Sequence, residues 1–193
     1  MARPKEFDRD EALRKATEVF WKSGYEATSI ADLARAMGIG RQSLYDTFRD
    51  KHALFLEALE LYKRERSGAA TRLLSEAVKP LDAVRNLFHD VADLPLELKK
   101  RGCLMVNTTM EACPSDAPVT RLVCDNQRVL KDAVRSALVR ATKSGALPKG
   151  TDPERLSRYL LTSLQGLYVT AKTEHDPAIL HDIADHMLRV LER

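Results

Sequence analysis

The feature that most constrains the fold is a pair of very short helical runs joined by only three residues. Apolar side chains recur at helical spacing over residues 30–37, and Leu44 and Phe48 follow four residues apart in the second run. The tripeptide Gly-Ile-Gly at 38–40 predicts a tight turn between them, because glycine takes positive φ at no steric cost. Helices of about two turns are marginal in water alone, so both must be held by packing.

A longer run before this pair would supply that packing. Asp8 or Asp10 is its predicted N-cap, and Gly24 ends it. The first short helix is predicted to begin after Thr28 or Ser29, with an acidic residue placed to complete a capping box. Two short helices backed by a longer one predict a helix-turn-helix, whose second short helix enters the major groove of DNA.

The rest of the chain also has the pattern of helices. Asp50 is the predicted N-cap of a helix that continues to Val78. Nowhere do β-branched and aromatic residues alternate with polar ones as a half-buried strand requires. The predicted fold class is therefore all-α, and the further helices are expected over residues 81–94, 102–113, 116–144, 153–172 and 177–192.

Composition narrows the function classes without choosing one. The 193 residues carry a net charge of +3, and residues 1–51 hold ten Lys or Arg against nine Asp or Glu. Any DNA binding would thus depend on a shaped surface more than on bulk charge. No apolar run approaches the roughly 18 residues of a membrane span, and the N-terminus is charged, so we expect a cytoplasmic protein. In that reducing compartment the three cysteines would be free thiols.

The stretch TSIADLARAMGIGRQSLYDTFRDKHALFLEAL, together with the run before it, resembles the TetR family of bacterial transcriptional regulators over about residues 8–59. The family signature pairs a Thr-x-x-x-Ile-Ala helix with a Gly-x-x-x-x-x-Leu-Tyr-x-x-Phe-x-x-Lys run. The segments RGCLMVN and SLQGLYV resemble one subgroup of the family. The resemblance implies a homodimer that binds a palindromic operator, usually as a repressor, and releases it when a small molecule enters the C-terminal domain. The expected domains are 1–50, the helix-turn-helix, and 51–193, the helical ligand-binding and dimerisation domain.

The resemblance also implies which residues contact DNA. Asp46 is not expected among them, because a carboxylate is repelled by DNA unless it accepts from a cytosine amino group. Gly40 departs from the family, which commonly has a Ser or Thr cap there. Apart from the resemblance, Arg3 and Lys5 would either belong to an unstructured start of the chain or form an arm that crosses the minor groove, as homeodomain arms do. Base or phosphate contacts are expected from Thr28, Ser29, Arg41, Gln42, Ser43, Tyr45 and Lys51, and Thr47 is predicted to face outward beside them.

The C-terminal domain offers a ligand cavity only in general terms, because apolar and thiol side chains of this kind line any helical core. Neither a cofactor nor a metal is predicted. His181 with Asp185 and Asp182 with His186 have the i,i+4 spacing of metal ligands, but the wet face of a helix explains them equally well. The candidate cavity residues are Phe88, Val91, Cys103, Val106, Asn107, Met110, Cys124 and Tyr168.

Dimerisation is predicted through the last two helices, because their apolar faces are extensive for a monomer surface. The candidate interface residues are Leu160, Leu164, Leu167, Ile183, Met187 and Val190.

Cys103 is a candidate reactive thiol through which an electrophile or oxidant, in place of a reversibly bound small molecule, would act as the effector. It follows a Lys-Lys-Arg-Gly stretch at the predicted start of a helix, and both features favour a thiolate. The alternative is an ordinary buried cysteine, since apolar residues lie beside it.

Two rival classes remain to be compared with a DNA-binding regulator. An enzyme would need a nucleophile with its base, a metal cluster or a phosphate-binding loop, and no G-x-S-x-G, H-E-x-x-H or G-x-x-x-x-G-K-[ST] motif occurs. A helical adaptor that binds only protein would show no salt-dependent affinity for DNA.

Overall fold

The computed structural model describes residues 7–113 and 115–192, and within them it contains helices and no strand. The predicted all-α class is confirmed. A π-helical turn, Lys63–Ser67, joins α4 to α5, and a short 3-10 turn follows α11 at Arg189–Leu191. The helices are α1 Arg9–Ser23, α2 Ile30–Met37, α3 Arg41–Phe48, α4 Lys51–Tyr62, α5 Gly68–Glu76, α6 Pro80–Ala92, α7 Leu96–Arg101, α8 Leu104–Glu111, α9 Ala117–Lys143, α10 Pro153–Thr170 and α11 Pro177–Leu188.

The N-terminal helices begin where their polar caps predict. The Asp8 carboxylate accepts hydrogen bonds from two backbone N–H groups of α1, and the Asp50 carboxylate accepts one from α4. Ser29 and Asp32 form a complete capping box at the start of α2. Such caps satisfy N–H groups that have no partner within the helix, so they fix the helix starts locally.

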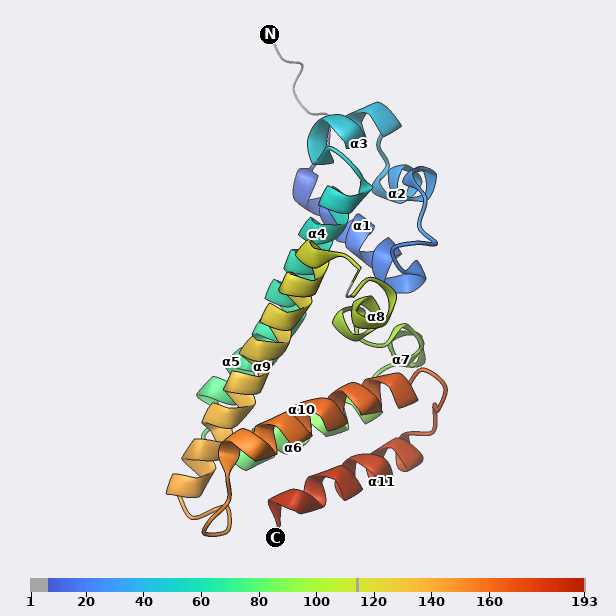
Figure 1. The fold of residues 1–193 in the computed structure, drawn as a ribbon. Coiled ribbons are helices and arrows are strands. Elements are labelled where there is room, and N and C mark those ends of the chain that lie inside the picture. The colour runs from blue at the N-terminus through green and yellow to red at the C-terminus, as the bar shows by residue number, and fades with distance from the viewer. Residues whose placement is uncertain (1–6, 114, 193) are drawn as a thin grey trace.

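The short helices are held by a core that extends beyond the helix-turn-helix. Leu33, Leu44 and Phe48 are buried against Phe20 of α1, and Leu54 of α4 joins the same core. Residues of α8 and of the first turns of α9 complete it. The N-terminal helices therefore sit on a fixed platform, with α3 at the end of the molecule opposite to α11 (Figure 1).

A second core joins the C-terminal helices. It is built from α5, α6, α9, α10 and α11, with Phe88, Leu138 and Leu160 among its fully buried side chains. The helices α5 and α9 run side by side, and α6 and α10 cross their lower end above α11 (Figure 1). None of the described helices is long and apolar enough to cross a lipid bilayer.

Two elements differ from the sequence prediction. The helix expected to run from Asp50 to Val78 is interrupted by the π-helical turn and ends at Glu76. The residues between the helices expected over 81–94 and 102–113 form the additional helix α7 directly after Pro95. Proline stops a preceding helix but is also suited to the start of the next one, and this second role was not predicted.

Candidate nucleic-acid interface and internal cavity

The helix α3 separates its buried and exposed residues cleanly. Leu44 and Phe48 are buried against α1 and α2, whereas Arg41, Gln42 and Tyr45 lie on the outer side and are exposed. The turn before α3 is tight because Gly38 adopts the left-handed conformation, with φ 72°. A helix so placed presents hydrogen-bonding side chains on a convex surface that fits a DNA major groove.

The start of α3 carries no side-chain cap, because its N-cap residue is Gly40. Gln42 is held one turn along by Asp46, whose carboxylate accepts a hydrogen bond of 2.9 Å from the Gln42 amide. Ser43 and Thr47 are half-buried at the edge of the exposed face. The structure thus brings the α3 candidates onto one surface and gives Asp46 the role of orienting Gln42.

Three further candidates lie next to α3. Ser29 is exposed at the start of α2, although its hydroxyl is engaged in the capping box. Lys51 opens α4, with its ammonium 4.3 Å from the centre of the Tyr25 ring and 3.5 Å from the Glu26 carbonyl oxygen. Helix N-termini and ammonium groups are both suited to phosphate oxygens.

Thr28 differs from its predicted role. Its side chain is only 2% exposed, and its hydroxyl donates a hydrogen bond to the Gly24 carbonyl oxygen. The Thr28 hydroxyl closes the turn between α1 and α2 and does not face a phosphate. Arg3 and Lys5 lie outside the described residues.

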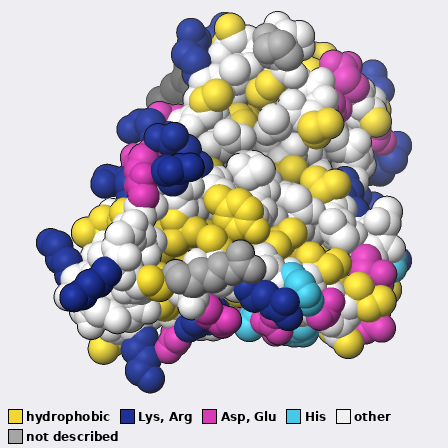
Figure 2. Space-filling model, turned by 60° about the horizontal axis from the view of Figure 1, so that its bottom comes forward, with side chains coloured by type: hydrophobic (Ala, Val, Ile, Leu, Met, Phe, Trp, Pro, Cys, Tyr) yellow, Lys and Arg dark blue, Asp and Glu magenta, His cyan; other side chains and the backbone are white. Residues whose placement is uncertain are grey.

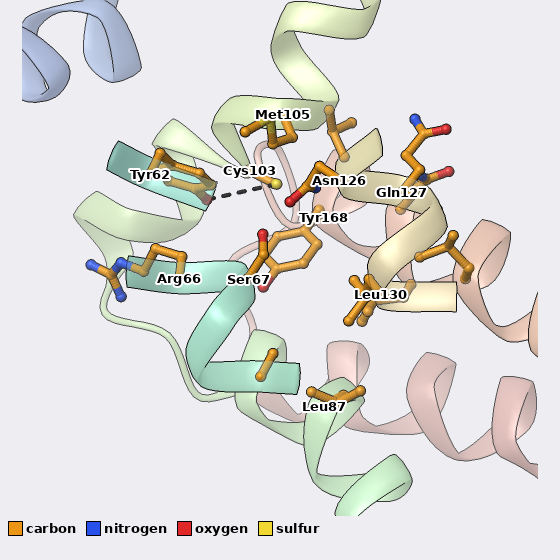
Figure 3. Close-up of a pocket in the computed structure, with 15 residues that line it drawn as sticks. Tyr62, Arg66, Ser67, Leu87, Cys103, Met105, Asn126, Gln127, Leu130 and Tyr168 are labelled. Carbon is orange, nitrogen blue, oxygen red and sulfur yellow. Dashed lines mark hydrogen bonds between the residues drawn. The ribbon is translucent and has the colours of Figure 1, made fainter. Parts of the chain in front are cut away.

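An internal cavity lies where the π-helical turn meets α8, α9 and α10. Its empty volume is about 670 Å³ with the open mouth included. Most of its lining is apolar, and Figure 3 shows Tyr62, Cys103, Asn126 and Tyr168 gathered around its interior. The π-helical turn contributes Arg66 and Ser67 to the wall, and such turns are frequent at functional sites.

The predicted cavity residues are only partly brought together. Cys103, Val106 and Tyr168 line the cavity, and Leu164, predicted as an interface residue, lines it as well. The other five predicted residues do not line this cavity. Phe88 and Val91 are packed in the second core. The Asn107 amide donates a hydrogen bond to the Arg101 carbonyl oxygen, and Met110 and Cys124 are exposed.

Sequence reasoning missed Asn126, Tyr62 and Ser67 as cavity residues. Asn126 had a recognisable signal, because it lies between Leu122 and Leu130 on the buried side of the long helix α9. Asn126 is four residues from each of these leucines, so it places a polar side chain in an otherwise apolar stripe. A polar group on the buried side of a helix requires a hydrogen-bond partner.

The expected thiolate at Cys103 is contradicted. Cys103 is the residue that caps α8, as predicted, but burial raises the pKa of its thiol despite backbone hydrogen bonds that oppose the shift. The Tyr62 hydroxyl donates to its sulfur at 3.6 Å. The neighbouring basic side chains have other partners, since Lys100 pairs with Glu97 and Arg101 forms an ion pair with Glu18.

The cavity side of the molecule is tied directly to the helix-turn-helix. The Trp21 indole N–H of α1 donates to the Gly102 carbonyl oxygen at 2.8 Å, one residue before Cys103. The Glu111 carboxylate at the end of α8 accepts from the backbone N–H groups of Tyr25 and Glu26, at 3.0 and 2.7 Å. These contacts join the cavity wall to the segment that leads into α2.

The close approach of Glu111 depends on glycine at position 24. Gly24 has φ 82°, and a Cβ atom there would lie 2.9 Å from the Glu111 carboxylate oxygens. Only a residue without a side chain leaves space for this contact, so Gly24 serves both the end of α1 and the tie to α8.

The predicted interface residues fall into two groups. Leu160, Leu164 and Leu167 are buried within the protomer, so their prediction as interface residues is wrong. Ile183 and Met187 are half-buried on α11, Val190 is half-buried in the 3-10 turn after it, and all three pack partly on the second core. The large apolar side chains that α10 and α11 leave exposed are Tyr159, Val169 and Ile179. In Figure 2, which turns this end of the molecule towards the viewer, hydrophobic side chains form a band across the middle.

One histidine and one aspartate of α11 pair across to α6 and to the residue that follows it. His181 contacts Asp93 at 2.8 Å, and Asp185 contacts His89 at 2.9 Å. His186 bonds the backbone of its own helix. No three His, Cys, Asp or Glu side chains of residues 7–113 and 115–192 are grouped so as to hold a metal ion.

Comparison with known proteins gives these surfaces a family. The family described as bacterial regulatory proteins, tetR family, matches residues 12–58, and the tetracyclin repressor-like C-terminal domain matches residues 80–187. The chain is 37% identical over 194 residues to YezE of Bacillus subtilis (strain 168), an uncharacterized HTH-type transcriptional regulator, with 100% of both proteins covered. It is 30% identical to the HTH-type transcriptional repressor ComR of Escherichia coli (strain K12), covering 97% of this chain and 90% of ComR.

A solved structure is similar over nearly the whole length. It contains a cysteine mutant of the TetR family transcriptional regulator CifR complexed with 26-base-pair double-strand operator DNA. The TM-score is 0.85 at 31% identity, with 98% of this chain and 100% of that chain covered. TetR-family proteins are DNA-binding regulators and not a class of enzymes. This chain belongs to the TetR family of bacterial transcriptional regulators.

Proposed function

We propose that this regulator is a repressor that binds a palindromic operator as a homodimer and is released by a small-molecule effector. Residues 1–50 would form the DNA-binding domain and residues 51–193 the regulatory domain, acting in the cytoplasm. The observation that carries the proposal is the two-sided α3, with Leu44 and Phe48 buried behind exposed Arg41 and Gln42. The repressor ComR and the operator-bound structure of CifR support it.

The DNA contacts would divide into reading and positioning. Gln42 would read a base through its amide, with adenine as the expected base, and Asp46 would fix its rotamer in the free protein. Arg41 and Ser43 would contact bases or phosphates at the start of the same helix. Tyr45, Lys51 and the start of α2 at Ser29 would contact phosphates on either side of the groove.

The homodimer would form through α10 and α11. Tyr159, Val169 and Ile179 are the exposed apolar side chains of these helices, and Ile183, Met187 and Val190 are half-buried beside them. A second copy that covers this face would place two α3 helices on the same side of the DNA. Operators with half-sites about one helical turn apart, roughly 34–36 Å, are the usual match for such a dimer.

The internal cavity would receive the effector. Its wall continues into a hollow lined by Trp21 and Gly102, which are joined by a hydrogen bond. A ligand that moves the segment next to Cys103 would therefore displace α1 through Trp21. Because α1 supports α2 and α3, such a displacement changes the placement of the reading helix.

Footprinting on the DNA upstream of the regulator's own gene, with a salt titration, tests the DNA-binding proposal. Gln42→Ala should weaken binding to the protected palindrome by about 1–3 kcal/mol and binding to random DNA much less. Lys51→Ala should weaken both alike and reduce the salt slope by about one unit. Lys143→Ala, at the far end of α9, is the control for charge removal. Equal losses on cognate and random DNA for Gln42→Ala would contradict the reading role.

A further inference from the structure

The cavity contains a buried amide whose carbonyl oxygen has no hydrogen-bond partner among residues 7–113 and 115–192. Asn126 is only 5% exposed, and its Oδ1 makes no hydrogen bond with any described residue. In Figure 3 its side chain points towards the space between Cys103 and Tyr168. Buried polar groups in folded proteins are nearly always hydrogen-bonded, so an unpaired acceptor inside a cavity marks a place where another molecule supplies the donor.

The surroundings of Asn126 determine the charge of that molecule. Among the residues that line the cavity, Arg66 is the one positively charged side chain, and none carries a carboxylate. The Arg66 guanidinium stacks 5.2 Å from the centre of the Trp21 ring, and Figure 3 shows it directed away from the interior. Burial raises the pKa of Tyr62 and of Tyr168, so both hydroxyls stay neutral. A charged ligand would lose its hydration here without gaining a counter-charge, so a neutral ligand is favoured.

The remaining wall determines the shape of the ligand. Leu87, Leu130 and Leu161 contribute apolar side chains to the lining, and Tyr168 adds an aromatic ring. The Tyr62 hydroxyl is already committed to the Cys103 sulfur, which leaves the Asn126 carbonyl oxygen as the buried acceptor without a partner. The other polar side chains of the lining, Ser67, Gln127, Gln165 and Tyr168, are only partly buried. Largely apolar walls with one fully buried acceptor fit a small ring with a single donor.

We propose that the effector is a neutral, largely apolar ring-sized molecule with an O–H or N–H group that donates a hydrogen bond to the Asn126 carbonyl oxygen. This inference rests on the proposed function for the place of the cavity in regulation, and it names the chemical class of the effector. Asn126 is the residue that distinguishes such a molecule from an equally apolar one without a donor.

A pair of probes that differ only in the donor tests the proposal. Indole carries a ring N–H, and benzofuran has nearly the same size and shape without a donor. Isothermal titration of the full-length protein should show indole binding ~10-fold more tightly than benzofuran, the ratio expected for one hydrogen bond. In Asn126→Leu the two affinities should become equal, because leucine has a similar volume and no acceptor.

Two controls keep the test specific. Gln127→Leu removes the neighbouring amide from the same wall and should keep the preference for indole. Asn126→Ala repeats the loss of the acceptor without adding bulk, in case the leucine variant folds poorly. Operator binding by each variant shows that it is folded.

The outcomes separate this inference from the proposed function. Preference for indole in the wild type and in Gln127→Leu, lost in both Asn126 variants, supports the proposal. Equal affinities in the wild type, a preference retained without Asn126, or binding of neither probe overturns it, whether or not the operator is protected. Absence of a protected operator overturns the proposed function, whatever the probes do.

Discussion

Replacement of Glu111 by alanine should cut the tie between α8 and the helix-turn-helix. The carboxylate accepts two backbone hydrogen bonds, from Tyr25 and Glu26, that no other described side chain supplies. A hydrogen bond to a charged group contributes about 1.5–3 kcal/mol when buried. Both N–H groups are on an exposed segment and return to water when the carboxylate is removed, so we expect a smaller total of about 2 kcal/mol.

The change is measurable as a shift in the melting temperature. For a chain of this size, ~2 kcal/mol corresponds to a lowering of Tm by about 4–8 °C. Glu97→Ala is the matched control, because Glu97 is an exposed glutamate whose ion-pair partner among the described residues is Lys100, one turn away. Its Tm should change by about 1–2 °C or less, as expected for a surface ion pair.

The same variant tests the coupling between cavity and DNA. Without the Glu111 contact, a ligand that binds the cavity should still bind, but it should reduce operator affinity by a smaller factor than in the wild type. Fluorescence melts and operator titrations with and without ligand give both quantities. If Glu111→Ala and Glu97→Ala lowered Tm equally, or if ligand response were unchanged in Glu111→Ala, the tie would have no role of this kind.

Three other perturbations have defined outcomes. Ser29→Ala breaks the capping box of α2 and should cost about 1 kcal/mol in a thermal melt, whereas a loss below ~0.3 kcal/mol would contradict the cap. Tyr159→Glu should give a folded monomer in sedimentation, because it places a charge on the proposed interface. Leu160→Ala, inside the protomer core, should lose about 2–5 kcal/mol of stability and remain a dimer. A dimeric Tyr159→Glu protein would disprove the interface. Hydrogen bonds from the Val119 N–H and from His52 hold the pKa of Asp116 below its ordinary value, so its contribution is present at neutral pH and is lost as pH falls below about 4. Asp116→Asn should therefore melt earlier than the wild type at pH 7, by a difference that shrinks as pH falls below about 4, and a constant difference across this range would contradict the assignment.

The helix starts could be predicted from the sequence because caps act locally. Asp8, Ser29 and Asp50 each satisfy N–H groups within three residues, and no distant part of the chain is needed to recognise them. The exposed face of α3 was predictable for the same reason, since Leu44 and Phe48 identify the inner side. The pattern could not show that the Thr28 hydroxyl turns inward to the Gly24 carbonyl.

The apolar stripe of α10 shows why helical periodicity alone cannot identify a dimer interface. Leu160, Leu164 and Leu167 form an apolar stripe, but the spacing cannot say whether the same chain or a second copy covers it. In the structure the protomer covers that stripe itself, and Tyr159 and Val169 lie exposed on α10.

The environment of Cys103 also depends on contacts distant in sequence. The neighbouring basic residues suggested a thiolate, but Tyr62 packs against the thiol from 41 residues away and Arg101 is directed to Glu18. Local charge is a poor guide to a thiol pKa when burial dominates, because the low dielectric penalises the charged form.

The π-helical turn Lys63–Ser67 has a consequence for chain length. Such a turn is a one-residue insertion accommodated within a helix, so the α-helices on either side keep their faces while the extra residue bulges outward. Deleting one residue from it would join α4 and α5 into an uninterrupted α-helix and restore regular hydrogen bonds. The part of the cavity wall formed by Arg66 and Ser67 would be lost with the bulge. Length variation at this turn would therefore change what the cavity accepts while the helix-turn-helix remained in place.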